Sequence, residues 1–281
     1  MKEHLRSLLF VPGNNPAMLQ TAGYLGADAI VLDLEDAVAL TEKDSARRLI
    51  MHALERLTFA ASTTIVRVNG LDTEFGVEDL NAVRMTQVSS VLLPKATLER
   101  IRRADEILCG TSIELIALLE SSLGVEMAFQ VATAVPRMRG LFFGAEDYTA
   151  DMGVPRTTEG SEVAFARARV ALAAKAAGIE AIDTPFVHTD DLDGFRRDVL
   201  LGRQLGYTGK ALVSPRHVMT LHDLLKPNDE EVSYAKRVLE ASAQALVRGK
   251  RVFGMDGKMI DAPIINRAKR IFALAARDGG G

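Results

Sequence analysis

Eight short apolar runs alternate with longer segments of helical periodicity, and this alternation limits the possible folds more than any other feature of the sequence. Most of the runs are apolar at consecutive positions, which is typical of parallel strands covered by helices on both faces. Strands are predicted at 8–13, 29–35, 63–70, 90–96, 114–121, 140–147, 179–185 and 210–215. Helices are predicted at 43–57, 98–108, 125–134, 161–178 and 192–206.

Eight such units favour an α/β fold of the (β/α)8 TIM-barrel type over an open sheet. The chain has 281 residues, 48% of them hydrophobic, which suffices for one large domain or two. A doubly wound sheet is the alternative architecture. It is disfavoured because no GxGxxG sequence follows any of the predicted strands, as a dinucleotide-binding sheet would require.

The pattern changes after residue 215. A helix is predicted at 228–247, a hairpin at 251–260 that turns at Asp256-Gly257, and a last helix at 261–277. A closed barrel does not need this helix–hairpin–helix extension. We therefore predict a catalytic barrel domain over residues 1–225 and an extension over 226–281 that packs on a neighbouring subunit or caps the barrel mouth.

Composition excludes several classes of function. A net charge of −3 supplies no broad basic field for nucleic acid or for an anionic membrane. The single cysteine, Cys109, cannot form an internal disulfide. No apolar run has the length of a membrane span and no signal-peptide pattern is present, so a cytoplasmic location is expected.

Charged side chains gather where the predicted strands end, which is where barrel enzymes place their active sites. Acids that converge on one mouth need a counter-charge there, because burying an unpaired charge is costly. Structural ion pairs at the rim are the alternative explanation. The residues are Asp33, Glu35 and Asp36 on the second strand, Arg67 and Asn69 on the third, Lys95 on the fourth, Glu120 and Ser121 on the fifth, and Glu146 and Asp147 on the sixth.

Oxygen ligands without a histidine cluster indicate a hard cation, and Mg²⁺ commonly binds through one or two carboxylates plus water and substrate. Glu120 and Asp147 are the predicted metal ligands. The two-residue period of a strand predicts that Asp33 and Glu35 lie on one side and Asp36 on the other. That acidic cluster is expected to orient metal-bound water, to hold Lys95 or Arg67, or to supply a base.

Other catalytic chemistries have weaker support. The five histidines show no HExxH-type spacing, and neither Ser121 nor Ser214 lies in a GxSxG elbow. Lys95 occupies a position where a Schiff-base lysine could stand, but ion pairing to the nearby carboxylates is the simpler explanation.

Seven motifs in order carry a family resemblance: LRSLLFVPGN, VLDLEDAV, IVRVNGLDTEFG, LLPKA, ALLESSLG, FGAEDY and DGKMIDAP. Together they resemble the citrate lyase beta subunit branch of the HpcH/HpaI aldolases, whose relatives include malyl- and citramalyl-coenzyme A lyases. The likeness extends from about residue 5 to residue 275. Ser214, which precedes Pro215, favours the citrate lyase branch over the stand-alone lyases.

The resemblance implies roles for individual residues. Glu120 and Asp147 match the Mg²⁺ ligands, and Arg67 matches the arginine that contacts substrate and steadies charge on the thioester. The acidic motif of Asp33, Glu35 and Asp36 holds metal-bound water and lies near the reacting atoms. Asp36 is assigned as a catalytic residue, and the base is a carboxylate of this motif or the metal-bound water that it orients. Further substrate contacts are assigned to Glu120, Glu35 and Lys95. Asp261 matches an acid or base that the C-terminal segment of a neighbouring subunit delivers in a homotrimer.

The resemblance also implies the reaction. It is a retro-Claisen cleavage of a β-hydroxy acyl thioester, such as citryl-acyl carrier protein or citryl-coenzyme A, to acetyl thioester and a keto acid such as oxaloacetate. Citramalyl- or malyl-coenzyme A cleavage, thioester hydrolysis on the same site, and a non-catalytic subunit of a complex are the alternatives. The expected partners are a coenzyme A or carrier-protein thioester and other citrate lyase subunits.

Overall fold

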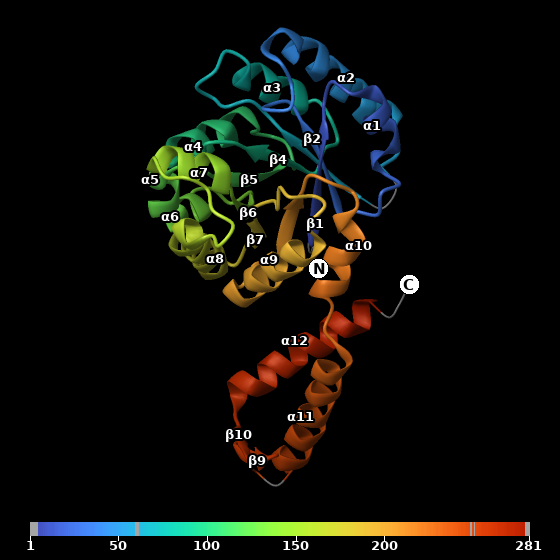
Figure 1. Cartoon of the computed structure of the whole chain (residues 1–281), viewed down its shortest axis with the longest axis vertical. Coiled ribbons are helices and arrows are strands. Elements are labelled where there is room, and N and C mark those ends of the chain that lie inside the picture. The colour runs from blue at the N-terminus through green and yellow to red at the C-terminus, as the bar shows by residue number, and fades with distance from the viewer. Residues whose placement is uncertain (1–4, 60–61, 248, 250, 279–281) are drawn as a thin grey trace. The chain divides into compact units, whose positions relative to one another are not determined.

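The computed structural model describes residues 5–59, 62–247, 249 and 251–278 (Figure 1). It divides the chain into two compact units, residues 1–221 and residues 222–281. The division falls inside helix α10 (His217–Leu225), close to the sequence-based boundary at 225/226. The assignment of the two segments as a catalytic domain and a subunit-bridging extension stays a prediction.

The first unit is built on eight parallel strands that close into a barrel in the order β1 to β8. Each strand pairs with the next along the chain, and β8 pairs with β1 to complete the ring. The predicted (β/α)8 architecture is confirmed. The strands are β1 (Ser7–Pro12), β2 (Ala29–Asp33), β3 (Thr63–Arg67), β4 (Ser90–Leu93), β5 (Glu114–Leu119), β6 (Met138–Phe143), β7 (Glu180–Asp183) and β8 (Gly209–Leu212).

Every strand contributes to one buried apolar cluster, which fills the barrel interior. Its members include Leu8, Val31, Ile65, Leu92, Leu118, Phe142, Ile182 and Ala211. Because side chains alternate between the two faces of a strand, the position two residues further along also faces the interior. On β2 and β3 that rule places Asp33 and Arg67 above the apolar cluster, at the carboxyl-terminal mouth. Glu120 directly follows β5, and atoms of Glu120 and of the core residue Leu118 both lie next to Gly144.

Helices surround the barrel and several have sequence-encoded ends. Thr97 and Asp191 cap the amino termini of α4 and α9 with their side chains, and Gly178 and Gly206 end α8 and α9 in the left-handed conformation. The helices are α1 (Pro16–Ala22), α2 (Lys43–Arg56), α3 (Gly76–Val83), α4 (Leu98–Ile107), α5 (Ser122–Glu126), α6 (Ala128–Ala132), α7 (Ala145–Met152), α8 (Ala164–Ala177), α9 (Leu192–Leu205) and α10, with short 3₁₀ turns η1 (Leu40–Glu42) and η2 (Ser161–Val163).

All eight predicted strands are present, but each ends one to four residues earlier than the sequence pattern suggested. Asp33 and Arg67 are the last residues of β2 and β3 and pair in the ladder. Other polar residues near the ends of the runs, such as Glu35, Asn69 and Glu120, lie beyond the strands. Asp147 in particular lies in the first turn of α7 and not on β6. The predicted helix 125–134 is two short helices, α5 and α6, that meet at Met127.

The second unit has its own small core. Helices α11 (Asp229–Val247) and α12 (Ala262–Asp278) pack together with a hairpin of β9 (Phe253–Met255) and β10 (Lys258–Ile260). The hairpin turns at Asp256 and Gly257, whose φ angles of 51° and 73° both lie in the left-handed region. That is the geometry favoured by the Asp-Gly sequence, as predicted.

Candidate active site at the barrel mouth

Arg67 is the centre of the acidic cluster. Its Nε and Nη2 donate to the two carboxylate oxygens of Asp33, each at 2.6 Å. Its Nη1 lies 3.0 Å from Glu35 Oε2 and 3.1 Å from Asp36 Oδ2. Burial alone would lower the pKa of Arg67, but the hydrogen bonds and charges of these carboxylates hold it above its ordinary value. The guanidinium is therefore permanently charged and fixed in orientation.

The strand-period prediction for Asp36 is wrong. Strand β2 ends at Asp33, and the backbone then turns back on itself, because Asp33 accepts hydrogen bonds from the amides of Glu35 at 2.9 Å and Ala37 at 3.3 Å. Alternation between faces no longer applies beyond the end of a strand. All three acidic side chains consequently reach Arg67.

Two further residues, Lys43 and Asn69, hold this acidic turn in place. The sequence did not single out Lys43. The buried Lys43 Nζ donates to the carbonyls of Leu34 at 2.7 Å and Glu35 at 2.6 Å. Asn69 donates to the Leu34 carbonyl at 3.0 Å. Nothing in its sequence context distinguishes Lys43 from the many lysines at exposed helix starts.

Glu120 follows β5 and is 5% exposed. Its Oε1 accepts the backbone amide of Lys95 at 2.7 Å, and Lys95 adopts a φ of 47°, a strained conformation for a residue with a side chain. Burial, followed by the charges of Glu35 and Asp147, raises the pKa of Glu120 to about 8 despite this hydrogen bond. The site thus contains a buried carboxyl group whose ionisation is opposed by its surroundings.

Glu35 and Asp147 complete the group of acids around Glu120. Burial raises the pKa of Glu35 to about 7, although Arg67 opposes the shift. Asp147 is exposed, and its carboxyl lies close enough to Glu120 to contribute to the raised pKa of that group. Carboxyl groups that approach one another this closely bind a proton or a cation in preference to remaining as neighbouring anions.

These acids fit a divalent cation with oxygen ligands. Glu35 Oε2 is buried without a hydrogen-bond partner, although it lies within ion-pair distance of Arg67, and it faces the same acidic space as Glu120. Within the described ranges no group of three or more acidic, histidine or cysteine side chains has the arrangement of a complete metal site. Two carboxylates with open positions are what Mg²⁺ ordinarily accepts from a protein.

The remaining predicted site residues divide between the two units. Lys95 is exposed, and its charge lowers the pKa of Glu35, so it lies at the same mouth. Asp261 belongs to the second unit, where its Oδ1 accepts the amide of Ile264 at 3.4 Å and caps α12. Glu146 pairs with Arg156 at 3.5 Å.

Gly144, directly before α7, leaves space that Glu120 needs. A Cβ added there would lie 2.7 Å from Glu120 Cβ and 3.0 Å from Glu120 Oε2. Gly144→Ala is therefore expected to displace the Glu120 carboxylate and to raise the Mg²⁺ concentration for half-maximal activity by about tenfold. Metal titrations of activity measure the change.

Gly153→Ala serves as the control, because a Cβ at Gly153 meets nothing within 4 Å although its φ is 69°. That variant is expected to lose stability through backbone strain with its metal requirement unchanged. Equal metal requirements in Gly144→Ala and in the unmodified protein would contradict the placement of the metal at Glu120.

The fold and the mouth together define a class of protein: a (β/α)8-barrel enzyme with a carboxylate-rich site of the divalent-cation type. The family model described as HpcH/HpaI aldolase/citrate lyase matches residues 6–215. The chain therefore belongs to the HpcH/HpaI aldolase/citrate lyase family.

Individual relatives agree with this assignment. The citrate lyase subunit beta of Haemophilus influenzae is 44% identical over 280 residues, covering 96% of each chain. A (3S)-malyl-CoA thioesterase of Cereibacter sphaeroides is 33% identical, over 96% of this chain and 94% of the relative. The structure of CitE from Mycobacterium tuberculosis in complex with magnesium, acetoacetate and coenzyme A is 28% identical with a TM-score of 0.84, over 98% of this chain and 100% of that one.

Proposed function

We propose that this protein is a Mg²⁺-dependent carbon–carbon lyase that cleaves a citryl-type thioester to acetyl thioester and a keto acid such as oxaloacetate. The observation that carries the proposal is the buried Glu120 carboxyl in contact with Asp147, next to an arginine fixed by three acids. The 44% identity to a citrate lyase beta subunit supports this substrate class.

Glu120 and Asp147 are the proposed ligands of the cation. When bound there, Mg²⁺ would act as a Lewis acid that acidifies the substrate hydroxyl and orients the carboxylate beside it. The magnesium in the M. tuberculosis CitE complex supports the choice of metal. Glu35 and Lys95 are proposed substrate contacts at the same mouth.

Arg67 is proposed to stabilise charge during bond cleavage. When the carbon–carbon bond breaks, its electron pair moves to the thioester, and negative charge develops on the thioester oxygen. A guanidinium that Asp33 already holds in a bidentate pair needs no reorganisation at that moment, which is the condition under which electrostatic stabilisation accelerates most.

Proton transfers are assigned to two carboxylates. Asp36, the most exposed acid of the Arg67 cluster, is proposed to take the proton of the substrate hydroxyl. Asp261 is proposed to return a proton to the acetyl carbon. The two transfers balance, since one proton is removed from oxygen and one is delivered to carbon. Positioned groups of this kind contribute about 10² to 10⁴ in rate.

Asp261 is proposed to act in trans, within a homotrimer in which the extension of one subunit completes the site of the next. Asp261→Asn is a sharp test, because asparagine also caps helix termini and the change leaves the α12 cap possible. The variant is expected to be nearly inactive alone. Mixed oligomers with Glu120→Gln are expected to regain part of the activity, since some interfaces would carry neither substitution.

Re-formed mixed oligomers that stay inactive would contradict completion of the site in trans. The measurement is turnover after co-refolding or co-expression, with each variant alone as its control. Sedimentation velocity on the same samples gives the number of subunits, for which a homotrimer is expected.

A second candidate function, thioester hydrolysis, is favoured by one observation, the 33% identity to a malyl-CoA thioesterase. Product analysis separates the two reactions. With citryl-, citramalyl- and malyl-coenzyme A as substrates, a lyase yields a keto acid and acetyl-coenzyme A, whereas a thioesterase yields free coenzyme A. EDTA is expected to abolish keto-acid release. Release of free coenzyme A alone would reject the lyase assignment.

Other candidates have less support. A Schiff-base mechanism would use Lys95, which is exposed and lacks the desolvated pocket that activates such lysines; borohydride trapping with substrate tests it. Citryl-acyl carrier protein is the next substrate if all three coenzyme A thioesters fail, and other citrate lyase subunits are then proposed partners. No helix among the described residues is long and apolar enough to cross a membrane. A cytoplasmic location is proposed.

A further inference from the structure

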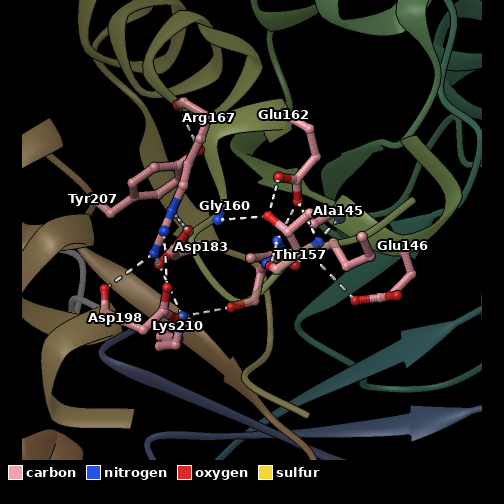
Figure 2. A network of polar contacts seen from close by, with 12 residues as sticks. Ala145, Glu146, Thr157, Gly160, Glu162, Arg167, Asp183, Asp198, Tyr207 and Lys210 are labelled. Atoms are coloured by element: carbon pink, nitrogen blue, oxygen red, sulfur yellow. Dashed lines mark hydrogen bonds and ion pairs between the residues drawn. The ribbon is translucent and has the colours of Figure 1, made fainter. Parts of the chain in front are cut away.

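Outside the barrel mouth, the buried side chains of Arg167, Asp183 and Lys210 form a cluster with the partly buried Asp198 (Figure 2). Arg167 forms a bidentate pair with Asp183 at 2.8 and 2.6 Å. Lys210 Nζ lies 2.9 Å from Asp183 and 2.5 Å from Asp198. Lys210 is 2% exposed and Asp183 is 1% exposed. We call this group the buried ion cluster.

The buried ion cluster lies on the outer face of the barrel wall. Ile182 belongs to the interior core, so its neighbour Asp183 faces the opposite side of β7, toward the helices. Arg167 and Asp198 come from α8 and α9. The cluster does not contact the acids of the mouth directly. A buried ion network of this kind is weak evidence for stability, because desolvation offsets much of its attraction.

A chain of hydrogen bonds connects the cluster to the mouth through Thr184. Lys210 Nζ donates to the carbonyl of Thr184 at 2.6 Å. Thr184 directly follows β7 (Glu180–Asp183), and its Oγ1 accepts the amide of Ala145 at 3.2 Å. Thr184 is 2% exposed. Ala145 is the first residue of α7, and Asp147 lies two residues further along the same turn.

Helix α7 is also held at other points. Arg156 lies 3.5 Å from Glu146 and donates to Glu162 at 2.6 Å. The amide of Ser122 donates to Asp151 at 2.7 Å. The Arg156 contact holds α7 at Glu146, and the Ser122 contact holds it near its carboxyl-terminal end. Thr184 accepts the amide of Ala145, the first residue of the helix. The position of Asp147 is thus set by groups that do not touch it.

We propose that Thr184, held in place by Lys210 of the buried ion cluster, is a positioning residue that sets the location of Asp147 and thereby the affinity for the divalent cation. The inference rests on the proposed function, since it requires that Asp147 bind the metal. It gives the buried Lys210 a role in the reaction although its side chain lies outside the barrel.

The test compares Thr184→Val, Thr184→Ser and Tyr207→Phe by their affinity for Mn²⁺, measured from the free Mn²⁺ signal in electron paramagnetic resonance. Valine keeps the shape of threonine but cannot accept the Ala145 amide, so the dissociation constant is expected to rise about tenfold. Serine retains the acceptor and is expected to restore the affinity. Tyr207 is the control, because its hydroxyl donates to the Arg167 carbonyl at 2.8 Å. Tyr207→Phe removes this hydrogen bond at Arg167 and leaves the hydrogen-bonding groups of Thr184 unchanged.

The outcomes are distinguishable. If unmodified protein and Thr184→Val bind Mn²⁺ equally well, the inference is overturned and the proposed metal site stands. If the unmodified protein binds no Mn²⁺, both are overturned. If Tyr207→Phe weakens Mn²⁺ binding as much as Thr184→Val, general loosening of the fold is responsible and the positioning role is rejected.

Lys210→Met extends the test to the cluster itself. In this variant Asp183 and Asp198 keep their contacts with Arg167. The substitution is expected to weaken Mn²⁺ binding on its own but to add little in the Thr184→Val background, because both act along one path. Additive effects would reject the path through Thr184. Thr184→Val alone decides the matter if Lys210→Met does not fold.

Discussion

Glu120→Gln is expected to abolish Mg²⁺-dependent keto-acid release, lowering kcat by about 10³-fold or more, with the barrel still folded. Glutamine has the same size and keeps an oxygen that can accept the Lys95 amide, but it has no charge with which to bind the cation. The several kcal/mol that a Lewis acid contributes to the transition state would be lost. Turnover at a saturating thioester concentration measures the loss of kcat. Circular dichroism shows whether the barrel is still folded.

Glu114→Gln is the matched control, because Glu114 begins the same strand at its opposite end. That variant is expected to retain full metal-dependent turnover. Normal activity in Glu120→Gln would show that the metal assignment is wrong.

Glu120→Gln is also expected to change how the stability of the metal-free protein depends on pH. The pKa of Glu120 is raised from 4.5 to about 8, so its contribution to stability is fully present below pH 4.5 and is lost as the pH rises through about 8. Metal-free protein is therefore expected to become less stable between pH 5 and pH 9, by roughly a few kcal/mol. Glu120→Gln is expected to show a weaker pH dependence in urea denaturation, and identical profiles would contradict the burial argument.

Arg67→Ala is expected to lower both activity and stability. The loss of charge stabilisation at the thioester oxygen is expected to reduce kcat/KM by about 10²- to 10³-fold. Asp33, which is 1% exposed, would then be a buried charge without its partner, at a cost of about 3–5 kcal/mol in the free energy of unfolding. Steady-state kinetics and urea denaturation provide the two values.

Two further variants separate these effects. Adding Asp33→Asn to Arg67→Ala removes the unpaired charge, so stability is expected to recover in part while activity stays low. Arg6→Ala breaks a comparable arginine–aspartate pair with Asp28 at the amino-terminal end of the barrel, and it is expected to cost stability without changing kcat. Recovery of activity in the double variant would contradict a catalytic role for Arg67.

The sequence predicted the barrel because a repeated physical pattern encodes it. Eight buried strands need apolar side chains on both faces, and this requirement is visible as continuous apolar runs. The ends of the strands were less predictable. In the sequence, Asp147 lies at the polar end of the run predicted as the sixth strand. In the structure, helix α7 already begins at Ala145. The sequence pattern does not show where the strand ends and the helix begins.

Contacts between distant residues explain the rest of what was missed. The carboxylates of the mouth stood out because acids next to apolar strands are unusual. Lys43 and Thr184 act through hydrogen bonds to backbone groups: Lys43 donates to the carbonyls of Leu34 and Glu35, and Thr184 accepts the amide of Ala145. Neither residue type is unusual at its position. Their roles depend on three-dimensional neighbours that no local sequence pattern specifies.

The central claim is that Glu120 and Asp147 hold the cation that drives carbon–carbon cleavage. Crystals of the protein grown with Mn²⁺ and measured at the manganese absorption edge test it most directly. The predicted result is an anomalous peak bonded to a carboxylate oxygen of Glu120 and one of Asp147, lost in Glu120→Gln crystals grown under the same conditions. A peak on other residues, or no peak at a saturating Mn²⁺ concentration, would contradict the account.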